Sequence, residues 1–140
     1  MIKKFVNRFM KAKPELKKKF SEDFVHSYAD IVKITLSAIA INFEDEPEES
    51  EDDQYYPDLD TNNIHEIDDG HYQGTKLFVI PEYGYQPSTY YAVFVSYGSC
   101  SCYDTLQGIS DFGMDDKPTK ENVKDYMTLA LHIVQGLKII

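Results

Sequence analysis

The chain has very little arginine: Arg8 is the only one among its 14 basic residues. Arginine supplies the planar, forked set of N–H donors that suits phosphate groups, and nucleic-acid binding also requires many positive charges on one surface. The net charge of −10 produces the opposite field. We therefore do not expect direct binding to nucleic acid.

Cysteine is also scarce, with only Cys100 and Cys102 in 140 residues. A disulfide between them would close a very small loop with poor geometry, so we expect two thiols packed in the core. No arginine follows them, which argues against a cysteine phosphatase. An alternative stays open in which His65 and His71 join the two cysteines in a thiol-dependent or zinc site. The leading interpretation has no metal and no other cofactor.

Long apolar runs and common catalytic motifs are missing as well. No apolar run approaches the roughly 20 residues that a helix needs to cross a bilayer, and the N-terminus lacks the apolar core of a signal peptide. The chain has no Gly-x-Ser-x-Gly elbow and no glycine-rich phosphate loop. We therefore expect a non-enzymatic protein of the host-cell cytoplasm that does not bind the membrane.

The charges that are present separate along the chain. Residues 1–19 carry eight Lys or Arg and one acid, Glu15, which is a net charge of +7. The rest of the chain must then carry −17, so we expect a strongly acidic body. Such a body suits a basic protein surface as its partner, including a surface that normally holds nucleic acid.

An amphipathic helix is predicted for residues 2–13, where apolar residues recur at helical spacing. Basic residues, Arg8 among them, occupy the other side. Pro14 ends this helix or starts a new turn. A basic amphipathic helix lies on an anionic membrane or docks on its own acidic domain, and we expect the second because the body supplies the complementary charge.

Two further helices are expected. Ser21 has the side chain of an N-cap and is followed by acidic residues, which predicts a helix that runs to about Ile41. Thr119 has the same role at the start of the last helix, whose apolar stripe from Val123 to Leu137 would cover a sheet.

Three strands are predicted between the second and the last helix. Thr75–Ile80 and Tyr90–Tyr97 are rich in β-branched and aromatic residues, and Ile64–Asp68 is a shorter candidate. The simplest arrangement is an antiparallel meander. We therefore predict one α+β domain over residues 1–140, in which N-terminal helices and a C-terminal helix pack on a small antiparallel sheet of about three strands.

The segment Glu44–Asp60 contains ten acidic residues, two prolines and no basic residue. Self-repulsion and proline predict a mobile loop at about residues 44–62. The same carboxylates would present a row of negative charges to a basic groove, with two tyrosines as interface anchors. The candidate partner-binding residues are Glu44, Asp45, Glu46, Glu48, Glu49, Glu51, Asp52, Asp53, Tyr55, Tyr56, Asp58, Asp60, Asp68 and Asp69.

A family resemblance covers about residues 64–109. The runs IHEIDDGHYQGTKLFVIPE and YYAVFVSYGSCSCYDTLQGI resemble a group of small, mostly uncharacterised proteins encoded by bacteriophages, in which a YGSCS segment leads into DTLQ. The usual segment of that group has a glycine and then a cysteine after CS, where this chain has Cys102 and Tyr103. The resemblance implies a phage origin and supplies no catalytic residues.

These observations together predict a small acidic interaction protein from a bacteriophage or mobile element. Its expected function is to bind and inhibit a host nucleic-acid-handling protein, such as a CRISPR effector, by occupying the nucleic-acid site with carboxylates. Two alternatives stay open. One is the thiol or zinc site, and the other is a structural or assembly protein whose basic N-terminal helix forms a homo-oligomer.

Overall fold

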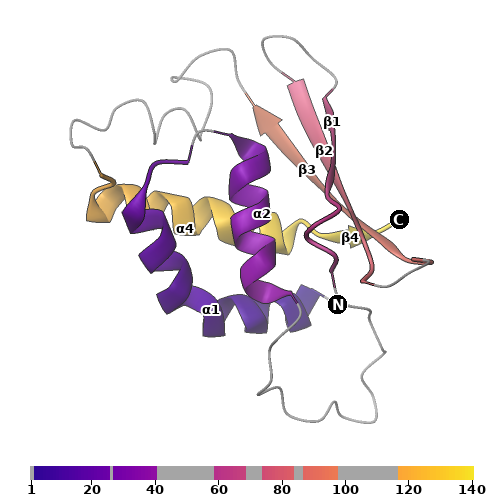
Figure 1. Ribbon diagram of the computed structural model, residues 1–140, viewed down its shortest axis with the longest axis horizontal. Coiled ribbons are helices and arrows are strands. Elements are labelled where there is room, and N and C mark those ends of the chain that lie inside the picture. Colours follow the sequence, from indigo (N-terminus) through magenta and orange to yellow (C-terminus); the bar gives the residue numbers. More distant parts are fainter. Residues whose placement is uncertain (1, 26, 41–58, 69–73, 84–86, 98–116) are drawn as a thin grey trace.

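The computed structural model describes residues 2–25, 27–40, 59–68, 74–83, 87–97 and 117–140. Within them lie α1 (Ile2–Glu22), α2 (Tyr28–Ile39), β1 (His65–Asp68), β2 (Gly74–Pro81), β3 (Tyr90–Tyr97), α4 (Lys120–Gln135) and β4 (Lys138–Ile139). The strands form one antiparallel sheet in the order β1-β2-β3-β4. The helices lie on one side of this sheet (Figure 1). The predicted α+β fold is confirmed, with four strands in place of three.

The fourth strand forms where the chain returns to the sheet after α4. Its two residues pair with Tyr91 and Ala92 of β3, and the N–H of Ile140 donates to the carbonyl of Tyr90 at 3.0 Å. Two residues are too few to show an alternating pattern, so sequence reasoning missed β4.

Helix α1 continues through Pro14, so of the two alternatives predicted for this proline, the one in which it ends the first helix is wrong. A proline inside a helix removes one hydrogen bond and costs about 3 kcal/mol. Burial of one continuous apolar face on both sides of Pro14 offsets this cost, because packing of such a face supplies most of the stability of helices in proteins. The face consists of Phe5, Phe9, Ala12, Leu16 and Phe20, all of which are buried.

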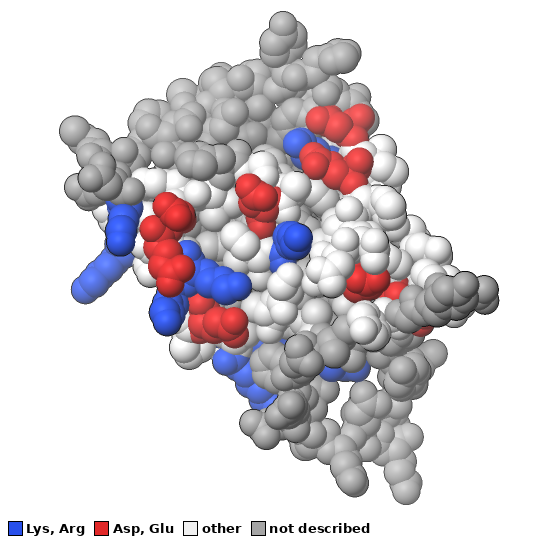
Figure 2. Space-filling model, in the orientation of Figure 1, with Lys and Arg blue, Asp and Glu red and all other residues white. Residues whose placement is uncertain are grey.

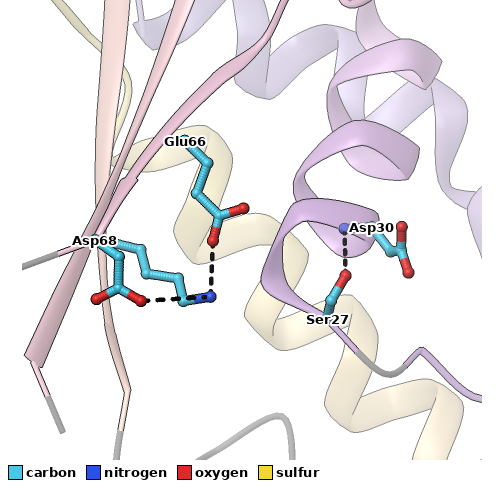
Figure 3. Close-up of polar contacts among 5 residues, drawn as sticks. Ser27, Asp30, Glu66 and Asp68 are labelled. Atoms are coloured by element: carbon cyan, nitrogen blue, oxygen red, sulfur yellow. Dashed lines mark hydrogen bonds and ion pairs between the residues drawn. The ribbon is translucent and has the colours of Figure 1, made fainter. Parts of the chain in front are cut away.

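The predicted N-cap at Ser21 is also wrong. Ser21 lies in the last turn of α1, where its hydroxyl donates to the carbonyl of Lys18 at 2.6 Å. The N-cap of α2 is Ser27, whose hydroxyl accepts from the N–H of Asp30 at 3.1 Å (Figure 3). Both serines are followed within three residues by an acidic residue, so the sequence preference for a helix N-cap fits both sites. The helix ends at Ile39, two residues before the predicted end at about Ile41.

Arg8 is buried, with 5% of its surface exposed, and does not lie on the polar side of α1 as predicted. Its Nη1 donates to the carbonyl of Ile39 at 3.1 Å, and its guanidinium lies 6.0 Å from the ring centre of Phe5. Ile39 is the last residue of α2, so the cation satisfies a carbonyl that the helix end leaves without a partner inside the helix. Arg8 therefore fixes α1 against the end of α2.

The tyrosines of α4 and β3 hold the helices to one another and to the sheet. The hydroxyl of Tyr126 accepts from the N–H of Val25, between α1 and α2, at 3.1 Å, and its ring lies 5.4 Å from that of Phe20. Tyr91 on β3 meets Phe5 edge to face at 5.6 Å. The predicted N-cap of α4 is confirmed, because Thr119 and Asn122 form a reciprocal capping box.

The connection between β2 and β3 is closed by one carboxylate. Oε1 of Glu82 accepts from the N–H of Ser88, from the hydroxyl of Ser88 at 2.9 Å and from the N–H of Thr89 at 3.3 Å. These donors, first the backbone N–H of Ser88, lower the pKa of Glu82 below its ordinary value of 4.5, because they stabilise the charged form. The carboxylate thus holds the two strands at this end.

Candidate interaction surfaces

Most of the residues that the sequence predicts for partner binding lie outside the described part of the chain. Of the fourteen candidates, Asp60 and Asp68 are within it. Those between residues 44 and 58, and Asp69, are outside it, as are Cys100, Cys102 and His71 of the alternative thiol or zinc site.

Asp60 uses its carboxylate to close its own turn. Its Oδ1 accepts from the N–H of Asn62 at 3.1 Å, and its Oδ2 accepts from the side-chain amide of Asn63 at 2.7 Å. Its N–H donates to the carbonyl of Pro81 at 2.9 Å, which ties this turn to the end of β2. Asp60 therefore has a structural role typical of aspartate in turns.

Asp68 shares a lysine with Glu66. Both side chains leave β1 on the same side and converge on Nζ of Lys76 on β2, which lies 2.7 Å from Glu66 and 4.0 Å from Asp68 (Figure 3). The register explains this, since Asp68 and Lys76 are direct cross-strand partners. One amine therefore offsets part of the charge that Asp68 was expected to present.

The charge of the described residues, which we call the framework, is positive. They contain all 14 Lys and Arg but only 10 of the 24 Asp and Glu, which gives +4, and the other 14 acids lie outside the described residues. On the face in Figure 2, blue side chains lie mainly along the left and lower edge, among red ones. The expected acidic body, residues 20–140, is only weakly negative within the described ranges, where it has six basic and nine acidic residues. Most of its negative charge lies in residues outside those ranges.

A groove of about 520 Å³ between α1 and α4 gathers four of these lysines. Lys13 and Lys17 stand on α1, and Lys120 and Lys124 stand on α4. The other lining residues are polar or apolar, and no acid is among them: Phe9, Ser21, Pro118, Thr119, Val123, Met127, Thr128 and Leu131.

Helical spacing explains how the groove is built. Residues four apart lie above one another on a helix, so α1 supplies one row that runs from Phe9 through both lysines to Ser21. Helix α4 supplies a polar row that starts at Lys120 and an apolar row of Val123, Met127 and Leu131. The rows can be read in the sequence, but the packing of α1 against α4 cannot. Sequence reasoning therefore missed this groove.

The outer face of the sheet is a second surface, which the described helices do not cover. Register places Ile67, Leu77 and Phe94 in one row across three strands, and Ile67 and Phe94 are 55% and 63% exposed. Tyr90 and Ile140 extend this apolar face. A sheet with one face in water usually alternates apolar and polar residues, whereas the strands here carry large apolar residues on both faces.

His65 is the only member of the alternative thiol or zinc site whose position is described. It lies exposed on β1 beside Val79 of β2. Within the described ranges, no group of three or more His, Cys, Asp or Glu is arranged to hold a metal ion.

Comparison with known proteins gives no match to a family model, to a curated protein or to a solved structure. None of the helices in the described ranges is long and apolar enough to cross a membrane.

Proposed function

We propose that this protein is a small interaction protein of bacteriophage type that inhibits a host nucleic-acid-handling protein. Its acidic segment, residues 44–58, would occupy a basic site that normally holds nucleic acid. The separation of charge carries this proposal: the segment has nine acids and no base, while all 14 basic residues lie on the described framework. No cation next to these carboxylates in sequence neutralises them, so they attract a basic surface over about one Debye length.

A pull-down from bacterial lysate at low and high salt tests this function. The intact protein is compared with a variant in which Glu48, Glu49, Asp52 and Asp53 become the corresponding amides. We expect a nucleic-acid-binding protein that is captured at low salt, displaced by added oligonucleotide, and lost with the variant or at high salt.

The matched control neutralises four exposed acids of the framework, Glu15, Glu22, Glu121 and Asp125, and should keep the partner. Equal loss with both variants, or no basic partner at low salt, would contradict the proposal. Bound zinc near one per chain in the same preparation would favour the cysteine site instead.

A second function, assembly through the outer face of the sheet, is favoured by its exposed apolar residues. The occupant we propose is a second copy of the chain. None of the described sheet positions on this face is acidic, because Glu66 and Asp68 point to the helix side with Lys76. Two copies therefore meet there without opposing carboxylates, despite their net charge of −10 each. The apolar face of α1 is buried within the chain, so we place the proposed assembly surface on the sheet.

The size of this outer face of the sheet determines how strong a dimer we expect. From the spacing of residues and strands, its footprint is roughly 400 Å² per copy, against about 800 Å² for a standard interface. The dimer should therefore be weak and concentration-dependent. In analytical ultracentrifugation, Phe94→Ser should abolish it and Met10→Ser, at a 52% exposed methionine of α1, should not. A monomer at every concentration would contradict assembly by this face.

A further inference from the structure

The groove between α1 and α4 holds four positive charges that repel one another. Lys13 and Lys17 are four residues apart on α1, and Lys120 and Lys124 are four apart on α4. Like charges at this spacing destabilise a helix, and none of the four forms an ion pair with a described carboxylate. A ligand with negative charges along both sides would relieve this repulsion.

The floor of the groove is apolar and adaptable. Val123, Met127 and Leu131 form one row on α4, and Phe9 faces them from α1. Val123 and Leu131 are partly exposed, so the floor is accessible. Methionine is unbranched and adjusts to ligands of different shape. The ligand should therefore carry an apolar stripe between its negative charges.

We propose that this groove binds an acidic amphipathic helix of a partner protein. The volume of about 520 Å³ falls in the range of ligand sites, and a groove between two helices with an apolar floor is a recurring receptor for such helices. Apolar side chains one turn apart on the bound helix lie on the row from Val123 to Leu131. Its Glu and Asp side chains meet the lysines on either side. This site uses none of the residues of the acidic segment.

Fluorescence anisotropy with a labelled synthetic peptide tests the site in the full-length protein. The peptide has Leu at positions i, i+3, i+4 and i+7 and Glu on both flanks, and the control peptide has Lys in place of each Glu. We expect saturable binding of the acidic peptide alone, weakening as salt is raised.

Two pairs of charge reversals distinguish binding in the groove from attraction by the overall charge of the protein. Lys17→Glu with Lys124→Glu changes one lysine on each wall and should weaken binding about tenfold or more. Lys11→Glu with Lys33→Glu makes the same change of net charge at exposed positions outside the groove. This control pair should change the affinity for the peptide by less than about twofold. Leu131→Gln should also weaken binding, because it removes part of the apolar floor.

Several results would overturn the proposal. One is no saturable binding, and another is equal weakening by both pairs of reversals. Binding of laurate without binding of the peptide would assign the groove to a small anionic amphiphile. Binding only after residues 44–53 are neutralised would assign it to the chain's own acidic segment. The pull-down tests other residues, so its outcome is separate from this one.

Discussion

The hydroxyl of Thr35 makes no hydrogen bond within the described core. Its Oγ1 is fully buried in α2 and has no hydrogen-bond partner among the described residues. Such a group lowers stability because it has lost its water. Thr35→Val keeps the shape and removes the hydroxyl. We expect the free energy of unfolding in urea to rise by about 1 kcal/mol. The exposed control on the same helix, Ser37→Ala, should change it little, and a loss of stability in the Thr35→Val variant would contradict the expectation.

Glu82 should make the stability of the fold depend on pH, because hydrogen bonds from Ser88 and Thr89 stabilise its charged form. Its pKa is lower in the folded protein than the ordinary value of 4.5, so the charged form favours folding. This contribution is present above that value and is lost as the pH falls through the folded pKa. Wild type should therefore unfold at a higher urea concentration than Glu82→Gln above pH 4.5.

The difference between the two proteins should shrink as the pH is lowered further. Ser88→Ala removes the hydroxyl donor but keeps the backbone N–H donor, so it should give a smaller difference of the same sign. A gap between wild type and Glu82→Gln that stays constant with pH would contradict this account.

At the scale of elements, Tyr126 joins α4 to the link between α1 and α2. Its hydroxyl accepts from the buried N–H of Val25, and Tyr126→Phe removes that acceptor while the ring stays beside Phe20. We expect the free energy of unfolding to fall by about 1–2 kcal/mol. Hydrogen exchange at the Val25 amide should become faster, whereas an unchanged rate would contradict the role of this contact.

Apart from β4, the strands were the most predictable elements, and the helix boundaries were the least. β2 and β3 match their predicted spans closely because each is rich in β-branched and aromatic residues and is bounded by turn residues. Pro14 and Ser21 misled the prediction because their usual effects are local, while burial of the apolar face of α1 decides the length of that helix. Arg8 was misplaced for a similar reason, since its partner is the carbonyl of Ile39 on another helix.

At the scale of the whole molecule, net charge alone was a poor guide to the surface. The total of −10 describes the framework with the wrong sign, because the framework carries +4. The sequence indicates where the acids are, in residues 44–58, but it does not indicate which segments form helices and strands together. The groove between α1 and α4 and the row from Ile67 to Phe94 depend on contacts between distant segments.

The pairing of β4 with β3 bears on how the chain folds during synthesis. Tyr91 leaves the ribosome well before its partner Ile139, and the whole of α4 is made between them. Until then, this edge of β3 lacks its β4 partner while the apolar outer face is already present. Such edges pair readily with other chains, so the nascent protein is most exposed to aggregation in the interval before β4 is translated.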